Sequence, residues 1–292
     1  MSSNILLANE AAARGAGRER TATAPRWRDL TAAEWLKFRS LRSNFVVLAT
    51  AVGIALLLAY GSAKQTADAW PGVNNWMVGS VQPAHDAFYP AGFFTIMTLV
   101  GTISAQSVVG EHASGLIRTT FIAVPGRSRV MLAKAAVMAG VLTVVGLITT
   151  AGCWQIMLAE YSGRITGYGW HSPGTATVFG ATVLLFPLAG LAGMALGALI
   201  RHTAVSIFAM VVYFWVMPVG ISSLDSIANT HIFVHVSNVL PENGWMFLTT
   251  MGSSTQHIVG GHPSAPEAWI SYAAWAVVAV LAIAFAPRRQ DV

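Results

Sequence analysis

Residues Gly110–Lys134 read GEHASGLIRTTFIAVPGRSRVMLAK. This stretch is polar and basic, and glycine and proline interrupt it, whereas the flanking runs Phe88–Val109 and Ala135–Ala159 are apolar. A break of this kind between two apolar runs is typical of a loop exposed on one side of a membrane. The stretch therefore predicts two membrane-spanning helices joined by an exposed loop.

The composition of the whole chain supports a membrane protein. Of 292 residues, 54% are hydrophobic and only 10% are charged, with a mean hydropathy of +0.58. Soluble domains carry about 25% charged residues, so this chain cannot cover a water-facing surface. We therefore expect an all-α polytopic membrane protein. The single cysteine, Cys153, lies in an apolar run and excludes an intrachain disulfide.

Six apolar runs define the expected membrane domain, 44–287. The runs cover about residues 44–60, 88–109, 130–159, 175–200, 203–224 and 268–286. Because a helix needs about 20 residues to cross the hydrocarbon core, the first run is short and the third can project into water. The fourth and fifth are separated by little more than Arg201-His202, which predicts a tight helical hairpin.

The distribution of lysine and arginine predicts the orientation. With the N-terminus inside, all of the 17 Lys and Arg residues except Lys64 and Arg164 are cytoplasmic. This positive-inside pattern predicts six spans in the cytoplasmic membrane, with both termini in the cytoplasm. The net charge of +5 follows this topology and forms no single basic groove, so nucleic acid is not an expected partner.

The N-terminal region divides into two parts. Residues 1–26 lack an apolar period and predict a disordered cytoplasmic tail. Residues 27–43 place Trp27 and other apolar residues on one stripe, which predicts an amphipathic helix in the headgroup region. Thr31 and Glu34 have capping-box spacing and could start this helix. Since Glu34 lies within the apolar stripe, it either caps locally or contacts a basic partner.

Several features refine the membrane domain. The loop 110–130 and residues 288–292 are expected in the cytoplasm. External loops are expected at residues 61–87 and 225–267, and the longer one contains two apolar segments that are too short to span. We expect these segments to form short re-entrant or interfacial helices. These segments are Ile232–Val234 and Trp245–Leu248. Helical bends are expected at Pro187 and Pro218, and close packing within the subunit at the pair Gly193 and Gly197.

Enzyme activity is not expected of this chain. It has no G-x-x-x-x-G-K-[ST] pattern and so no P-loop for ATP. Ser114 follows a His-Ala pair, but it lies in the cytoplasmic loop and not beside a buried histidine, which argues against an intramembrane protease. His231 and His235 have i, i+4 spacing, yet no acid or cysteine completes a metal site. Glu160 and Asp225 fall at predicted membrane ends, which disfavours a proton-coupled carrier.

Two segments together carry a family resemblance. The run Gly110–Arg118, followed by a proline turn and basic residues up to Lys134, resembles the ABC-2 type transporter permeases, especially actinobacterial ones. Residues Glu34–Ser40, EWLKFRS, look like the E-W-x-K-L-R-[ST] start of the same family. The resemblance covers nearly the whole chain after residue 27, with Leu116 in place of the usual threonine.

This resemblance implies the permease subunit of an ATP-driven exporter. Two permease copies would work with two copies of a separate ATPase subunit, and ATP and Mg²⁺ would bind in that partner. The loop after the second span would form a coupling helix in a groove of the ATPase, with Glu111 near the helix start. The residues implied in coupling are Glu34, Arg39, Gly110, Glu111, Gly115, Arg118, Pro125, Arg127 and Arg129.

The substrate is expected to be hydrophobic or amphipathic, such as an antibiotic, a peptide or a lipid. It would pass between two permease copies, and candidate lining residues chosen by position are Phe94, Thr98, Tyr213 and Trp215. Two alternatives stay open: a non-transporting membrane immunity or scaffold protein that binds a toxic peptide, and an intramembrane enzyme that depends on Ser114 or the two histidines.

Overall fold

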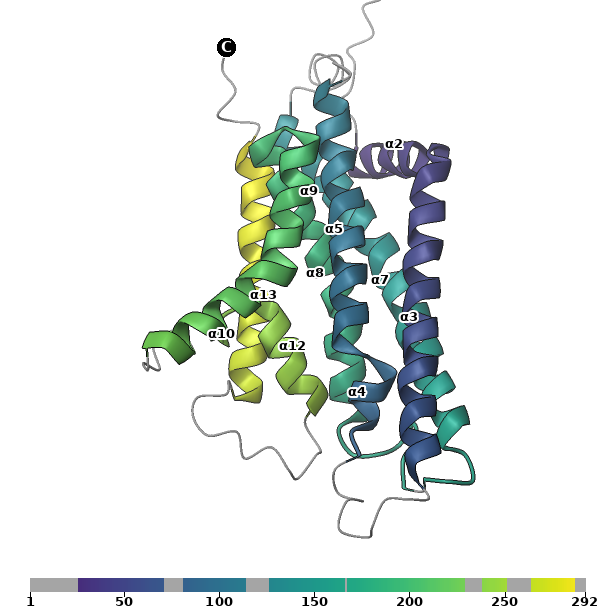
Figure 1. Cartoon of the computed structure of the whole chain (residues 1–292). Helices are drawn as coiled ribbons and strands as arrows, with labels where there is room; N and C mark the ends of the chain where they lie inside the picture. The colour runs from purple at the N-terminus through teal and green to yellow at the C-terminus, as the bar shows by residue number, and fades with distance from the viewer. Residues whose placement is uncertain are drawn as a thin grey trace, which may run out of the picture.

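The computed structural model describes residues 26–70, 81–113, 126–165, 167–228, 238–250 and 264–286. Within these ranges the chain is all-α and contains no strand. Six helices are long and apolar enough to cross a membrane, and they stand side by side in one bundle (Figure 1). The expected all-α fold with six candidate spans is therefore confirmed.

The candidate spans match the six apolar runs closely. The fifth begins as α9 and continues through a π-helical segment, η3, into α10. The bounds are α3 (Arg42–Ala69), α5 (Pro90–Ala113), α7 (Arg127–Tyr161), α8 (Thr175–Ile200), α9 (Thr203–Val211), η3 (Val212–Val216), α10 (Met217–Ala228) and α13 (Ala265–Phe285).

Large apolar side chains cover the outer faces of the bundle. Leu57, Ile148, Phe208 and Ile270 are 71%, 62%, 68% and 66% exposed, respectively, and they lie on four different helices. A soluble protein rarely exposes so much contiguous apolar surface, whereas a hydrocarbon environment favours it. The exposed belt thus fits a membrane protein.

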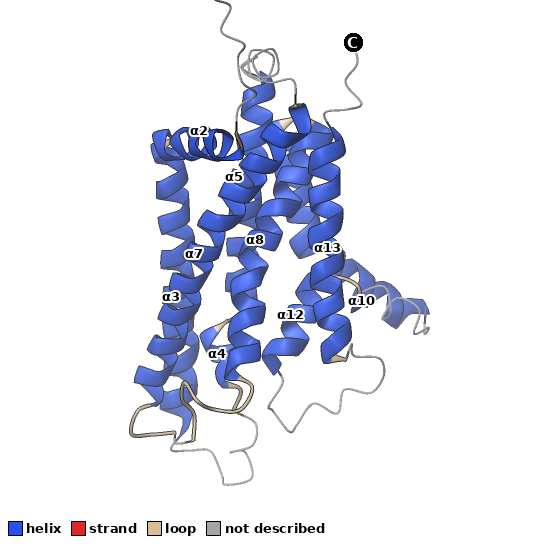
Figure 2. Ribbon diagram, turned by 180° about the vertical axis from the view of Figure 1, so that it is seen from behind, coloured by secondary structure: helices blue, strands red, loops and turns tan. Residues whose placement is uncertain are grey.

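The amphipathic helix α2 (Trp27–Ser40) lies across one end of the bundle (Figures 1 and 2). It ends where Leu41 adopts an extended backbone, three residues before the predicted end at 43. The expected capping box at Thr31 is wrong. The helix begins four residues earlier, and the Thr31 hydroxyl instead donates to the carbonyl of Arg28 inside the helix.

The first span is longer than its apolar run. Helix α3 continues to Ala69, into the region predicted as external loop 61–87. Alanines at every fourth position, from Ala51 through Ala67, form a fully buried stripe on this helix. Such small side chains let neighbouring helices approach closely. Alanine also has the highest helix propensity, which favours the extension of α3 beyond its apolar part.

A short helix, α4 (Pro83–Ala87), also lies within the predicted external loop. Its Asp86 is buried, and the Ser62 hydroxyl of α3 and the Tyr161 hydroxyl of α7 donate to its two carboxylate oxygens. These hydrogen bonds satisfy a buried carboxylate and join three helices at the end of the bundle opposite α2.

Helix α8 packs most closely against α5. A Cβ atom on Gly193 would collide with the backbone of Gly101, and one on Gly197 would meet the backbone of Ala105. The predicted close packing within the subunit is therefore confirmed. Helix α8 ends at Arg201, whose left-handed backbone (φ 56°) starts the expected tight hairpin into α9.

The fifth span changes direction along its length. It passes through η3, and α10 then swings away from the bundle (Figure 1). Pro218 is the second residue of α10, so a bend lies where one was predicted. Pro187 lies inside α8, which remains one continuous helix.

The segment Trp245–Leu248 belongs to a short helix, α12 (Pro241–Thr250), as expected. Trp245 is completely buried, stacks on Phe93 of α5 and donates its indole N–H to the Thr182 hydroxyl of α8 at 3.1 Å. Helix α12 is therefore an integral part of the bundle core. The other predicted short segment, Ile232–Val234, lies outside the described residues.

We predict that Gly193→Ala lowers stability by about 1–3 kcal/mol, because the added methyl group forces α5 and α8 apart. Gly140→Ala is the matched control, since a Cβ there meets no heavy atom within 4 Å. Thermal unfolding of the purified protein measures both. Equal effects of the two substitutions would contradict close contact at Gly193.

Candidate functional site

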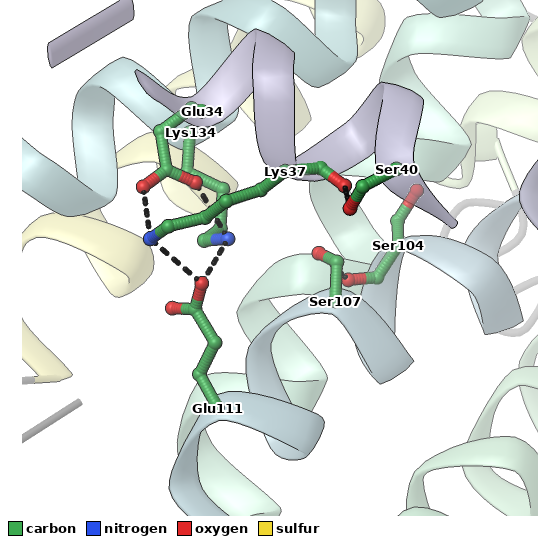
Figure 3. Close-up of polar contacts among 7 residues, drawn as sticks. All are labelled: Glu34, Lys37, Ser40, Ser104, Ser107, Glu111 and Lys134. Carbon is green, nitrogen blue, oxygen red and sulfur yellow. Dashed lines mark hydrogen bonds and ion pairs between the residues drawn. The ribbon is translucent and has the colours of Figure 1, made fainter. Parts of the chain in front are cut away.

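Four charged side chains meet where α2 crosses the ends of α5 and α7 (Figure 3). Lys37 Nζ lies 2.7 Å from Glu34 Oε1 and 3.0 Å from Glu111 Oε1. Lys134 Nζ lies 2.7 Å from Glu34 Oε2 and 2.9 Å from Glu111 Oε1. Each lysine thus contacts both carboxylates, and we call this arrangement the charge cluster.

The charge cluster is largely withdrawn from solvent. The side chains of Glu34, Lys134 and Glu111 are 4%, 8% and 13% exposed, and that of Lys37 is 41% exposed. Two carboxylates and two ammonium groups sum to no net charge. Charges this deeply buried persist only when they are paired, so removing any one of the four leaves an uncompensated charge.

The local sequence explains why these side chains converge. Glu34 and Lys37 lie one turn apart on α2, and Leu30, Glu34 and Phe38 form its buried face at i, i+4, i+8. The question that the sequence left open for Glu34 is thereby answered: it contacts basic residues of its own chain. It caps nothing at the start of α2.

The position of Glu111 differs from the expectation. The sequence places it near the start of a short helix, but it lies in the last turn of α5, which continues to Ala113. A carboxylate at a helix C-terminus is unfavourable next to the negative end of the helix dipole. Lys37 and Lys134 neutralise this carboxylate, so the helix can continue past it.

The pKa of Lys37 reports the strength of the pairing. Burial alone lowers the pKa, but hydrogen bonds and charge attraction from Glu34 and Glu111 outweigh this effect and raise it above 10.5. A raised lysine pKa gives a stabilisation that is fully present below pH 10.5 and is lost as the pH rises through the folded-state pKa. The cluster is therefore intact at neutral pH.

A pocket of about 350 Å³ opens beside the charge cluster. Phe38 and Met138 form part of its apolar wall, and Asn44, Gln106 and Ser107 add polar groups. The pocket lies between α2, α3, α5 and α7, next to the point where α5 leads into residues 114–125. The α2 end of the bundle thus combines the charge cluster with an accessible pocket.

The remaining predicted coupling residues have different positions. Arg39, Gly110, Arg127 and Arg129 are exposed at the α2 end of the bundle. Gly115, Arg118 and Pro125, together with the protease candidate Ser114, lie outside the described residues. Among the described coupling residues, Glu34 and Glu111 therefore come together, because each of them contacts both Lys37 and Lys134.

Three of the four predicted substrate-path residues come together. The Trp215 indole N–H donates to the Thr98 hydroxyl at 3.3 Å, and the rings of Phe94 and Trp215 meet edge to face. Tyr213 is separate from this group, because its ring packs against Trp275 of α13. Successive residues of η3 thus face different helices.

Sequence reasoning missed Lys37 and Lys134 as members of the site. The i, i+3 spacing of Glu34 and Lys37 was a local signal for one ion pair. The family resemblance placed Glu34 and Glu111 in one coupling set, but no local pattern indicated that Lys37 and Lys134 connect them.

It also missed Glu242, which is completely buried in α12. The expectation about acidic residues concerned Glu160 and Asp225 and did not consider Glu242.

Within the described residues, no group of three or more His, Cys, Asp or Glu residues could hold a metal ion. His231 and His235 are outside those residues, so the metal alternative stays a hypothesis. No protein-family model and no curated protein matches this chain.

We predict that Lys134→Ala lowers stability by about 3–5 kcal/mol, because Glu34 and Glu111 then share a single, half-exposed lysine. The control is Lys64→Ala, which removes an exposed pair with Asp68 and should cost at most about 1 kcal/mol. Denaturant or thermal unfolding in detergent compares the two. Similar losses of stability in the two variants would show that the buried charge cluster stabilises the protein no more than an exposed ion pair does.

Proposed function

We propose that this chain is the transmembrane permease subunit of an ATP-driven exporter of the ABC-2 type. It works as a homodimer with a separate ATPase subunit, which binds ATP and Mg²⁺. The observation that carries the proposal is the charge cluster, which joins α2 to the ends of the two helices flanking residues 114–125.

The charge cluster supports a role in transmitting motion. A force applied to α2 or to residues 114–125 acts on both α5 and α7, because four short ion pairs hold these elements together. Strong, buried pairs resist separation, so the elements move as one body. This is the property that energy transfer from a separate ATPase to membrane helices requires.

The docking contacts are assigned to the exposed arginines at the same end. Arg39, Arg127 and Arg129 are exposed at the α2 end of the bundle. Guanidinium groups form bidentate pairs with carboxylates, so the fitting surface on the ATPase is acidic. In this proposal the cluster transmits movement and the arginines make the contact.

The substrate route is assigned to the face shared by α5 and η3. Thr95, Thr98, Thr102 and Gln106 follow helical spacing on the less buried side of α5. Polar residues toward lipid are costly, and they usually face a protein interior or a water-filled route. With Trp215 beside them, they suit an amphipathic substrate between two copies of the chain.

Affinity purification of the tagged protein from its native cells tests the assignment. We expect a Walker-type ATPase in stoichiometric complex with the chain. The double substitution Arg127→Glu and Arg129→Glu should reduce its recovery at least tenfold, because the reversed charges repel an acidic docking surface. Lys64→Glu, a charge reversal at the opposite end, is the control and should leave recovery unchanged.

Two outcomes contradict this proposal. Purification without any ATPase favours the immunity or scaffold alternative, in which the chain binds a toxic peptide by itself. Undiminished recovery with the double substitution removes the arginines from the docking surface.

The substrate route has its own test. Trp215→Ala should weaken stimulation of the ATPase by an exported compound severalfold, because it removes an indole ring from the route. Ile270→Ala, which removes an exposed apolar side chain of α13, is the control. Equal stimulation in the two variants would place the route elsewhere.

A further inference from the structure

Glu242 differs from every other described carboxylate of the bundle core. It is completely buried, and neither carboxylate oxygen makes a regular hydrogen bond with a described residue. Glu34, Glu111 and Asp86, by contrast, have hydrogen-bonding or ionic partners. A buried carboxylate without partners is costly in its ionised form.

The depth of Glu242 in the bundle follows from the contacts of its neighbours. The backbone carbonyl of Val239 accepts hydrogen bonds from Ser271 and from Trp275, which is about halfway along α13. Gly244 lies against Ala268, near the start of α13. Helix α12 therefore begins well inside the bundle and runs outward, toward the end opposite α2 (Figure 1).

Among the described residues, the groups around Glu242 provide no positive charge. Tyr213 of η3 interacts with the carboxyl group, and Tyr272 of α13 lies nearby with its hydroxyl donated to the Ala181 carbonyl. Helix α8 contains no titratable residue between Thr175 and Ile200. The described titratable residues of α4, His85 and Asp86, interact with each other instead.

A proton can neutralise this carboxyl group without displacing any side chain. It adds a single hydrogen to a buried carboxylate oxygen that makes no regular hydrogen bond with a described residue.

We propose that Glu242 is a proton-binding site that holds α12 in the bundle when the carboxyl group is neutral and loosens α12 when it is ionised. The proton comes from the aqueous phase at the end opposite α2 and returns to it. This inference does not depend on the exporter proposal, because it concerns the isolated chain.

The electrostatics of the site agree with this geometry. Burial raises the pKa of Glu242 from 4.5 to about 7, against a smaller opposing effect of hydrogen bonding. Because the folded state binds the proton more tightly than the unfolded state, stability falls as the pH rises from 4.5 to about 7 and then levels off. Ionisation near neutral pH therefore weakens the packing of α12.

Loosening of α12 has a defined route to the rest of the bundle. Trp245 of α12 contacts both Phe93 and Phe94 of α5, and Phe94 in turn contacts Trp215 of η3. A shift of α12 removes one side of this aromatic row. The proton site is thereby connected with the face where α5 and η3 meet.

Thermal unfolding of the purified full-length chain at about pH 5 and about pH 8 tests the proposal. The Glu242 carboxyl group is expected to be mostly neutral at the lower pH and mostly ionised at the higher pH. Glu242→Gln mimics the neutral carboxyl group. We expect it to raise the Tm by several degrees at the higher pH, to leave the Tm unchanged at the lower pH, and to flatten the pH dependence between them.

Glu267→Gln is the matched control, because Glu267 is an exposed carboxylate at the start of α13. It should keep the wild-type pH dependence. Hydrogen–deuterium exchange at the higher pH adds a local measurement, in which residues 241–250 should be more protected in Glu242→Gln than in the wild type. Tyr213→Phe should move the pH dependence to higher pH, because the phenol favours the ionised carboxylate.

Three results overturn the proposal. They are a wild-type pH profile in Glu242→Gln, an equal loss of Tm at both pH values in that variant, and unchanged exchange in residues 241–250.

Discussion

The arrangement of this bundle depends on neutralising two buried carboxylates at one end. Glu34 comes from α2, which lies across the bundle, and Glu111 comes from the last turn of α5. Lys134 at the start of α7 bridges the two, and Lys37 completes the set. Because neither carboxylate can be desolvated alone, the three helices must meet at this point. The position of α2 is therefore an electrostatic requirement as much as an effect of its apolar face.

Away from the charge cluster, small side chains and aromatic rings determine the packing. The glycines of α8 bring that helix against α5, and the alanine stripe of α3 brings it against its neighbours. Aromatic rings fill the space that remains toward α12, with Trp245 at their centre. The core is thus tightly packed along α5 and α8, while the fifth span, interrupted by η3, is the least buried of the six. π-Helical turns occur often at functional sites, and this one presents Trp215 beside α5.

The α2 end and the interior of the bundle treat buried carboxylates in opposite ways. At the α2 end, each acid contacts both lysines, which fixes it in position. In α12, the titratable groups that interact with Glu242 among the described residues are the phenols of Tyr213 and Tyr272, and burial favours its neutral form. The first arrangement suits a rigid joint and the second suits a group that changes charge near neutral pH. In the proposed exporter, a rigid joint would face the ATPase, and a titrating group would lie inside the bundle.

The sequence by itself determined the number of spans, the transverse helix and the packing role of Gly193, because these depend on run length, helical period and side-chain size. It also indicated that Glu34 needed a partner. Only the tertiary structure decided that the partners are Lys37 and Lys134, since the contacts with Glu111 join residues far apart in the chain. The burial of Glu242 was equally hidden, because an acid at the start of a short helix is ordinarily a solvated cap. Local pattern determines which helices form, whereas the burial and pairing of a charge depend on the other helices packed around it.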